Sequence, residues 1–402
     1  MQPFEGIRVL DFTHVLAGPF AAYQLAVMGA DVIKIEDPNA PDMMRPEGVS
    51  PALNDAGLGT RFQAQGGNKR MIAVDLKSEA GRDIILRLVD TADVVISNFR
   101  TGTMERLELD AEMLTSRKPD LIWCTMTGFG ATGPKADHPA YDNVVQAYSG
   151  LVSSTGHPGG LPVKVGPPVL DYGTGAQAAF AIAAALFQRT RTGKGQKIDV
   201  SMLDAALMLM TSAVSDSDVR SGPMLPHGNS DPIRPAYGLF ETADGQLMIG
   251  AFTNRQVARL WRTLGNDARA REAETRTAAA WQTHGPEDRI ALQAALKART
   301  AQDWEDVLNA AGVPAARLRD MYEAMTSVQV ASRDVLQPGV VAPETGRAIA
   351  TPVAAFSYAD GTGPKLHRPT VARGADTAAV LEELGMSAVE ISALRADGVI
   401  NA

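Results

Sequence analysis

Cysteine is nearly absent from this sequence, and so are the patterns that mark secretion or metal binding. The single cysteine, Cys124, excludes an internal disulfide framework and is typical of a reducing compartment. The first residues contain neither a charged n-region nor an apolar h-region, so no signal peptide is predicted. None of the six histidines has metal-ligand spacing, and there is no HExxH or CxxC pattern. We therefore expect a cytoplasmic protein without a metal site.

An excess of positive charge and long apolar runs are also missing. Lys and Arg number 38 against 46 Asp and Glu, which gives a net charge of −8 and does not favour nucleic acid or an anionic membrane as partner. No uninterrupted run approaches the roughly 18 apolar residues of a membrane span, so no membrane contact is expected. Hydrophobic residues make up 45% of the 402 residues, enough for an ordinary core, and the length favours two domains.

Short apolar runs alternate with helical stretches in the first half of the chain. Strand-like residues 8–12 and 31–36 flank a helical stretch at 20–29, and the alternation returns in 81–99 and 110–130. This pattern predicts an α/β fold with a parallel sheet covered by helices on both faces. Ligands of such sheets lie beyond the carboxyl ends of the strands, so the loops of interest begin near His14, Asp37, Asn98, Thr127 and Asp171.

The second half of the chain changes pattern after a Gly- and Pro-rich stretch near residues 215–235. Asp244-Gly245 between two β-type runs predicts a hairpin, and helical stretches follow from about 255 to 311. Residues 334–357 then become strand-like with Pro-rich loops, and two short helical stretches end the chain. A tail of this length is expected to pack back on the first domain.

Two nucleotide-binding patterns are incomplete. Glu36 and Asp37 follow the second strand, where a ribose-binding acid would lie, but the first turn has one glycine and lacks G-x-G-x-x-G. The basic turn Arg191–Gln196 follows a helix and has no Ser or Thr after its lysine, unlike a phosphate loop. Cys124 lies inside an apolar run, which favours a buried small hydrophobe over a nucleophile.

Asp171 is the candidate catalytic residue. Thr174 and Gln177 match a capping box, so the Ala-rich helix is predicted to begin there and to leave Asp171 just before the cap. The helix dipole would keep the carboxylate ionised, and Gly173 and Gly175 would let a substrate approach the backbone. Such a carboxylate suits covalent catalysis, with a structural carboxylate as the alternative.

Seven segments, in this order, resemble the class III CoA-transferases, which include formyl-CoA transferase and carnitine CoA-transferase and are related to α-methylacyl-CoA racemase. They are residues 6–22, 28–38, 68–99, 128–134, 141–151, 170–207 and 237–251. The resemblance implies a Rossmann-like large domain, a smaller α+β domain, and a ring-shaped subunit in an interlocked homodimer. The implied bounds are 1–215 for the N-terminal part of the large domain, 216–235 for a linker, 236–325 for the small domain and 326–402 for a C-terminal segment returning to the large domain.

The resemblance also implies the chemistry, a transfer of CoA from an acyl-CoA to a small carboxylic acid through covalent intermediates on Asp171. No tightly bound cofactor is expected, since acyl-CoA is a substrate. The alternatives are an acyl-CoA racemase and a nonenzymatic CoA-binding protein. Racemases have a histidine where Tyr141 stands, and His138 is three residues too early to replace it.

Departures from formyl-CoA transferase bear on the substrate. Leu16 replaces a glutamine, Asp37 replaces an arginine, and the glycine-rich loop of the small domain is missing. These differences favour a larger and less polar acyl group, such as a dicarboxylate or a branched acid, with succinyl-CoA as a candidate donor.

The positions implied to surround CoA include backbone donors and basic side chains. Val15 and Leu16 would offer N–H groups to the thioester oxyanion, and Lys77 and Arg106 would lie near the phosphates, although such side chains are often merely solvated. The full set is Val15, Leu16, Lys77, Asn98, Phe99, Arg106, Tyr141 and Met202.

Overall fold

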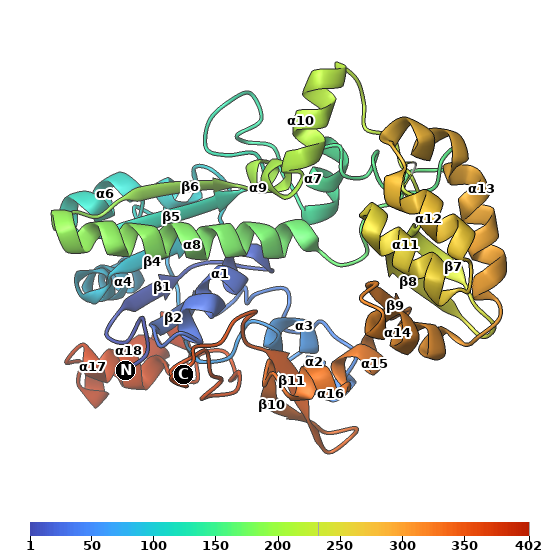
Figure 1. Ribbon diagram of the computed structural model, residues 1–402. Helices are drawn as coiled ribbons and strands as arrows, with labels where there is room; N and C mark the ends of the chain where they lie inside the picture. Colours follow the sequence, from blue (N-terminus) through green and yellow to red (C-terminus); the bar gives the residue numbers. More distant parts are fainter. Residues whose placement is uncertain (232, 402) are drawn as a thin grey trace. The chain divides into compact units, whose positions relative to one another are not determined.

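Seven strands form one sheet in the larger of two units of this computed structural model, which describes residues 1–231 and 233–401 (Figure 1). The larger unit comprises Met1–Leu151, Lys164–Val219 and Val328–Ala402, and the smaller unit comprises Val152–Val163 and Arg220–Ser327. The chain therefore leaves the larger unit and returns to it twice.

The central sheet has the strand order β12-β3-β2-β1-β4-β5-β6. Strands β1 to β6 are all parallel to one another, and β12 pairs with β3 in the antiparallel sense. The prediction of an α/β fold with a parallel central sheet is confirmed. The order reverses between β1 and β4, and ligands of doubly wound sheets bind at such a switch point. The strands are β1 Arg8–Asp11, β2 Asp31–Glu36, β3 Lys69–Val74, β4 Val94–Ser97, β5 Ile122–Thr127, β6 Lys197–Ser201 and β12 Ile400–Asn401.

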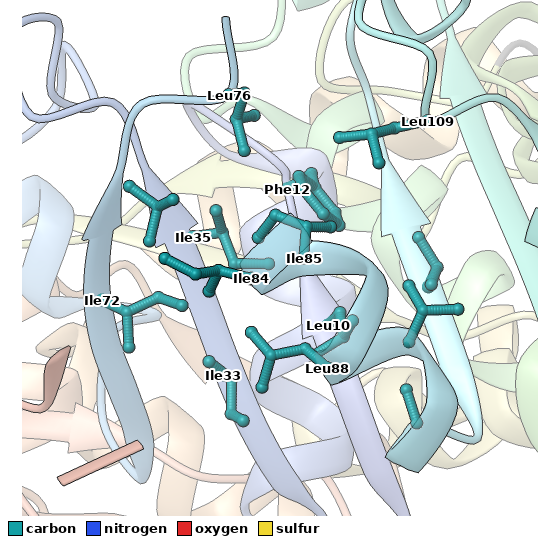
Figure 2. Packing of buried hydrophobic residues seen from close by; sticks show 14 of the residues in the cluster. Leu10, Phe12, Ile33, Ile35, Ile72, Leu76, Ile84, Ile85, Leu88 and Leu109 are labelled. Carbon is teal, nitrogen blue, oxygen red and sulfur yellow. The ribbon is translucent and has the colours of Figure 1, made fainter. Parts of the chain in front are cut away.

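Helices cover both faces of this sheet. On one face, Ile84, Ile85 and Leu88 of α4 pack on the aliphatic side chains of β1, β2 and β3 (Figure 2). The C-terminal helices α17 and α18 contribute to the same core, while α1 and α8 cover the other face. The main covering helices are α1 Ala17–Ala26, α4 Glu79–Thr91, α6 Ala111–Arg117, α8 Val169–Thr192, α17 Thr377–Glu383 and α18 Ala388–Ala396.

Shorter elements complete this part of the chain. They are α2 Pro51–Asp55, α3 Thr60–Gln63, α5 Thr103–Arg106, α7 Asp142–Tyr148, α9 Met202–Leu209, α10 Thr211–Arg220, α16 Val328–Ala331 and the antiparallel pair β10 Leu336–Ala342 and β11 Arg347–Pro352. The chain end returns as predicted, because Ile400 pairs with Val74 and the Asp75 N–H donates to the Val399 carbonyl at 2.8 Å.

Helix α8 lies very close to α1 and α9. A Cβ atom on Gly175 would lie 2.5 Å from the Ala17 carbonyl oxygen, and one on Gly173 would lie 2.8 Å from Leu209 Cδ1. Gly175 therefore allows α8 to pack against the backbone of α1, a role other than the expected approach of a substrate, whereas Gly173 faces only the end of the Leu209 side chain. Among the described residues, α8 is the one helix long and apolar enough to cross a membrane, although a core helix of a protein in water meets the same criterion.

The smaller unit is built on a three-stranded antiparallel sheet in the order β7-β8-β9. The predicted hairpin at Asp244-Gly245 is confirmed, since Thr242 and Gly245 close the turn between β7 and β8. Helices then follow where the periodicity indicates them. The elements are β7 Tyr237–Glu241, β8 Gln246–Gly250, α11 Asn254–Thr263, α12 Asp267–Thr275, α13 Ala278–Leu296, α14 Ala301–Ala310, β9 Ala315–Arg317 and α15 Met321–Met325.

One segment differs from the predicted domain bounds. Residues 152–163 were expected in the large domain, yet they group with the smaller unit. A long-range backbone contact accounts for this, because the Gly228 N–H donates to the Gly156 carbonyl at 2.7 Å. Nothing in the local sequence around Gly156 indicates a partner more than 70 residues away.

Candidate functional site

A cavity of about 530 Å³ opens beyond the carboxyl ends of β1, β4 and β5. It lies at the switch point of the sheet, where the loops after β1 and β4 run in opposite directions. Three of the five predicted loops contribute to it, those near His14, Asn98 and Thr127, and the one near Asp37 does not. Asp171 contributes from the first turn of a helix, where a loop was predicted. The lining consists of residues 14–17, 98–101, 126–128 and 136–141 together with Arg106, Asp171, Thr174 and Met202.

Seven of the eight residues predicted to surround CoA lie around this cavity with Asp171. Lys77 is the exception, since its side chain is 78% exposed and its ammonium lies 3.8 Å from the Asp37 carboxylate. The seven are Val15, Leu16, Asn98, Phe99, Arg106, Tyr141 and Met202. Their contacts with CoA remain predictions.

Asp171 lies in the first turn of α8, which begins at Val169. The predicted capping box was wrong, because Thr174 is inside the helix and its hydroxyl donates to the Leu170 carbonyl at 2.6 Å. The acceptor for the helix start comes instead from Asp142 on α7. Its Oδ2 accepts the N–H groups of Leu170 at 2.7 Å and of Asp171 at 3.1 Å.

The surroundings of Asp171 disfavour its ionised form. Burial, followed by the nearby Asp142 carboxylate, raises the pKa of Asp171 to about 7, and the Ala17 N–H opposes this rise. Burial and Asp142 therefore act against the helix dipole, which was expected to keep Asp171 ionised. Local sequence could not reveal this, because Asp142 lies 29 residues away along the chain.

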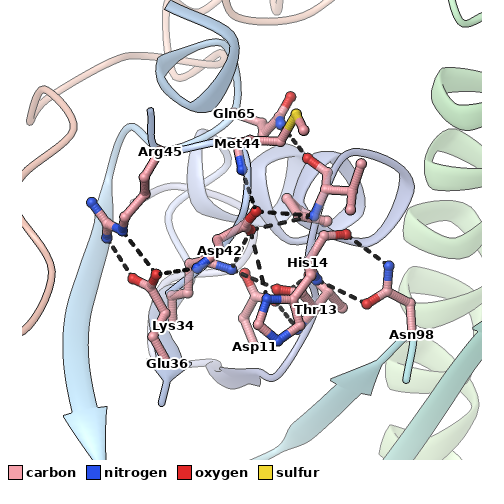
Figure 3. A network of polar contacts seen from close by, with 12 residues as sticks. Asp11, Thr13, His14, Lys34, Glu36, Asp42, Met44, Arg45, Gln65 and Asn98 are labelled. Carbon is pink, nitrogen blue, oxygen red and sulfur yellow. Dashed lines mark hydrogen bonds and ion pairs between the residues drawn. The ribbon is translucent and has the colours of Figure 1, made fainter. Parts of the chain in front are cut away.

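The loop after β1 holds an unusual backbone conformation. Val15 has a φ of 69°, a region that costs a β-branched residue about 1–3 kcal/mol and persists only where the surroundings enforce it. Three side chains bind all four backbone polar groups of His14 and Val15 (Figure 3). Asn98 exchanges two bonds of 2.8 Å with His14, the Val15 N–H donates to Asp42 at 3.3 Å, and Gln65 donates to the Val15 carbonyl at 2.9 Å.

This arrangement bears on the roles expected of Val15 and Asn98. The Val15 N–H, expected to face an oxyanion, donates to the Asp42 carboxylate in this structure. The amide of Asn98 supports the loop through both of its polar atoms, which gives it a role that the sequence did not indicate. In the described part of the chain, the Leu16 N–H has no protein acceptor and remains available at the start of α1.

Buried ion pairs lie beneath this loop. Lys34 lies 3.3 Å from Asp42 and also donates to the Thr13 carbonyl at 2.5 Å. Lys69 lies 2.8 Å from Asp11, and all four charged side chains are at most 1% exposed. Removing one partner of such a pair leaves a buried unpaired charge, which typically costs about 3–5 kcal/mol.

Two histidines line the cavity. His14 stacks on Phe99 with ring centroids 5.1 Å apart, and burial, followed by the Lys34 ammonium, lowers the pKa of His14 and favours its neutral form. His138 shares the cavity with Tyr141 and Asp171, although sequence spacing had separated it from the position of a racemase base. This proximity makes a direct test of proton exchange necessary.

Arg100 and Arg106 supply positive charge to the cavity lining. Within residues 1–231 and 233–401, neither has a carboxylate at ion-pair distance, and Arg106 donates to the Thr103 hydroxyl at 2.9 Å. Guanidinium groups in this state fit an anionic ligand such as a phosphate. In the same described ranges, no cluster of three His, Cys, Asp or Glu side chains could hold a metal ion.

Comparisons with known proteins agree over almost the whole chain. The model of CoA-transferase family III matches residues 4–377. A succinate–glutarate CoA-transferase of Agrobacterium fabrum is 35% identical, covering 95% of this chain and 96% of the relative. An acetyl-CoA:oxalate CoA-transferase of Acetobacter aceti is 38% identical, with 85% and 87% covered. The crystal structure of a CAIB/BAIF family protein from Brucella suis has a TM-score of 0.81 and 29% identity, with 95% and 99% covered.

The raised pKa of Asp171 predicts a pH-dependent effect of Asp171→Asn on stability. The folded protein retains a proton on Asp171 that the unfolded chain loses above pH 4, so Asp171 destabilises the fold increasingly from pH 4 to 7. Asp171→Asn should raise the free energy of unfolding at pH 8 by about 2–4 kcal/mol and have little effect at pH 4. Urea unfolding at both pH values measures this, and a gain that is equal at both would contradict the prediction.

The backbone contacts of Asn98 predict that Asn98→Ala weakens both stability and activity. Both polar backbone groups of His14 would lose a partner, which should lower the free energy of unfolding by about 1–3 kcal/mol. The Val15 loop would lose its support, so kcat/KM should fall at least about tenfold for whichever reaction the cavity serves. Asn39→Ala, at an exposed position outside the cavity, is the matched control. Unchanged kcat/KM in Asn98→Ala would show that the loop needs no such support.

Proposed function

This chain belongs to CoA-transferase family III and is an acyl-CoA:carboxylate CoA-transferase, and we propose that it works through covalent intermediates on Asp171. The observation that carries this proposal is the position of the Asp171 carboxylate, which lines the cavity at the switch point of the sheet; its burial there, followed by Asp142, raises its pKa to about 7. A carboxylate is the side chain that can exchange acyl groups with another carboxylate at little thermodynamic cost.

The proposed reaction begins when an Asp171 oxygen attacks the donor thioester carbonyl. The C–S bond breaks, CoA thiolate leaves, and a mixed anhydride joins Asp171 to the donor acyl group. The thiolate then attacks the Asp171 carbonyl, which releases the donor acid as a carboxylate and leaves an aspartyl-CoA thioester. An acceptor carboxylate reverses both steps, so that Asp171 is regenerated and the acceptor leaves as the new thioester.

The lining of the cavity supports the binding steps of this scheme. Arg100 and Arg106 are suited to phosphate groups of CoA, and the Leu16 N–H at the start of α1 is suited to the thioester oxyanion. The apolar side chains of Leu16 and Met202 border the same space. We assign Arg100 and Arg106 to the CoA phosphates, the Leu16 N–H to the thioester oxygen, and the side chains of Leu16 and Met202 to the acyl group.

We propose a dicarboxylic acid as one of the two exchanged acids. The names of the two relatives include succinate, glutarate and oxalate, all of which are dicarboxylates. Leu16 at the cavity wall favours an acyl chain with apolar methylene groups over the small and polar oxalate. Succinyl-CoA with glutarate is therefore the first donor and acceptor pair to assay.

A prediction for Asp171 follows from the covalent scheme. Asp171→Ala should reduce transfer from succinyl-CoA to glutarate by at least about 10⁴-fold, because no carboxylate remains to carry the acyl group. CoA binding, measured by calorimetry, should change little. With the unmodified protein and donor alone, hydroxylamine should convert Asp171 to its hydroxamate, which peptide mass spectrometry detects.

The same assay in heavy water separates transfer from racemisation. A racemase using Asp171 and His138 would exchange the proton at the α-carbon of a 2-methylacyl-CoA with solvent. Deuterium at that carbon without any new thioester would reject the transferase function, and hydroxamate formation would then be absent.

We further propose a homodimer of interlocked, ring-shaped subunits. Large apolar side chains on α8 and α9 are exposed in the single chain, with exposed fractions of 71% for Phe180, 59% for Phe187 and 64% for Met208. Exposed apolar patches of this kind typically mark protein contacts, and a second copy of the chain would cover them.

The dimer predicts a specific response to charge on α8. Sedimentation velocity should give a dimer at micromolar concentration, and Phe180→Glu should shift it toward monomer because a charge would be buried at the contact. Val389→Glu on α18, where the side chain is 80% exposed, is the control.

Differently tagged interlocked dimers should not exchange subunits without denaturant. A monomer at every concentration would reject the dimer, and rapid exchange would reject interlocking.

A further inference from the structure

Asp142, the first residue of α7, is a buried carboxylate held by three donors. It is 8% exposed, and its Oδ2 accepts the N–H groups of Leu170 and Asp171. Its Oδ1 accepts the Gln146 side-chain N–H at 2.5 Å, and the side-chain Oε1 of Gln146 in turn accepts the Val165 N–H at 2.9 Å. Each of these contacts is donated to Asp142, so both of its carboxylate oxygens act as acceptors.

A charge at this place is not needed to start the helix. The first turn of any helix has unpaired N–H groups, and a neutral Ser, Thr or Asn side chain satisfies them as well as Asp does. Here the acceptor is a buried negative charge, and one of its donors is the backbone N–H of Asp171, the residue that carries the candidate nucleophile. The charge therefore acts on Asp171 in addition to supporting α8.

We propose that Asp142 is a positioning residue of the transfer reaction: its buried carboxylate, held by the backbone N–H of Asp171, favours the neutral acyl adducts of Asp171 through charge repulsion. This inference rests on the proposed covalent function of Asp171. Protonation and acylation each remove the negative charge from Asp171, so both relieve the same repulsion. A neighbouring charge that makes the carboxylate harder to keep ionised also makes it a better acyl acceptor.

The other groups around Asp171 do not supply this effect. The Ala17 N–H from α1 favours the ionised form, and Met202 from α9 contributes an apolar side chain. Tyr172 is adjacent on α8, and burial, followed by Asp171 itself, raises the pKa of its hydroxyl. His14 and Arg106 line the same cavity, but among the groups that shift Asp171 the only like charge is Asp142.

Asp142→Asn tests the inference because it keeps an acceptor for α8 and removes the charge. The acid limb of the kcat/KM profile should move down by about one pH unit, and kcat at pH 8 should fall about tenfold. KM for acyl-CoA should change less than about twofold. A partly unfolded variant would also lower kcat at constant KM, but it would leave the acid limb in place. Asp110→Asn is the matched control, since Asp110 caps α6 through the N–H groups of Glu112 and Met113 outside the cavity. An acid limb that stays in place in Asp142→Asn would overturn the proposal.

Unfolding free energies, which do not depend on activity, separate the role of Asp142 from the covalent function of Asp171. At pH 8 the gain in unfolding free energy from Asp171→Asn should shrink at least by half when Asp142→Asn is already present. An unchanged gain would overturn the role of Asp142, whatever chemistry Asp171 performs. Coupling without any hydroxamate on Asp171 would reject the covalent function, and the catalytic role of Asp142 with it. Asp142→Ser, another neutral cap, replaces Asp142→Asn if the latter does not fold.

Discussion

Two buried ion pairs, Lys34 with Asp42 and Lys69 with Asp11, support the loop on which the candidate site depends. Asp11, Lys34 and Lys69 come from the three neighbouring strands β1, β2 and β3, so the sheet places these charges within reach of one another. Their remaining hydrogen bonds go to the loop and to α1, where Lys34 binds the Thr13 carbonyl and Lys69 binds the Pro19 carbonyl at 2.8 Å. The two ion pairs thus hold the loop in its strained conformation, because breaking either pair would leave a buried unpaired charge.

The site combines this rigid loop with a carboxylate in an unfavourable environment. Gly175 lets α8 approach α1 so closely that the Ala17 N–H can reach Asp171, while Asp142 and burial act in the opposite sense. A residue kept in such a state destabilises the folded protein, and function is the usual reason why the state persists. Acylation would remove the negative charge of Asp171, and with it the cost of burying that charge next to Asp142. This connects the electrostatics of the fold with the proposed covalent chemistry.

Local patterns in the sequence predicted the fold well and the site in part. The alternation of apolar runs indicated the parallel sheet, and Asp244-Gly245 indicated the hairpin, because both signals depend on neighbouring residues. The start of α8 was misjudged, since its acceptor comes from Asp142 and not from Thr174. The same cause explains why the roles of Asp42, Asn98 and Gln65 around Val15 were missed. These features depend on contacts between residues far apart in the chain, which a short sequence pattern does not reveal.

The central claim is that an oxygen of Asp171 passes into the exchanged acids, and isotope transfer tests it directly. When an 18O-labelled acceptor carboxylate forms the anhydride with Asp171, attack of CoA thiolate on the acceptor carbonyl leaves the bridging 18O on the aspartate. After turnover with acyl-CoA and labelled glutarate, mass spectrometry of the peptide containing Asp171 should therefore show 18O in its side chain. Formation of labelled glutaryl-CoA without 18O on Asp171 would contradict the covalent mechanism.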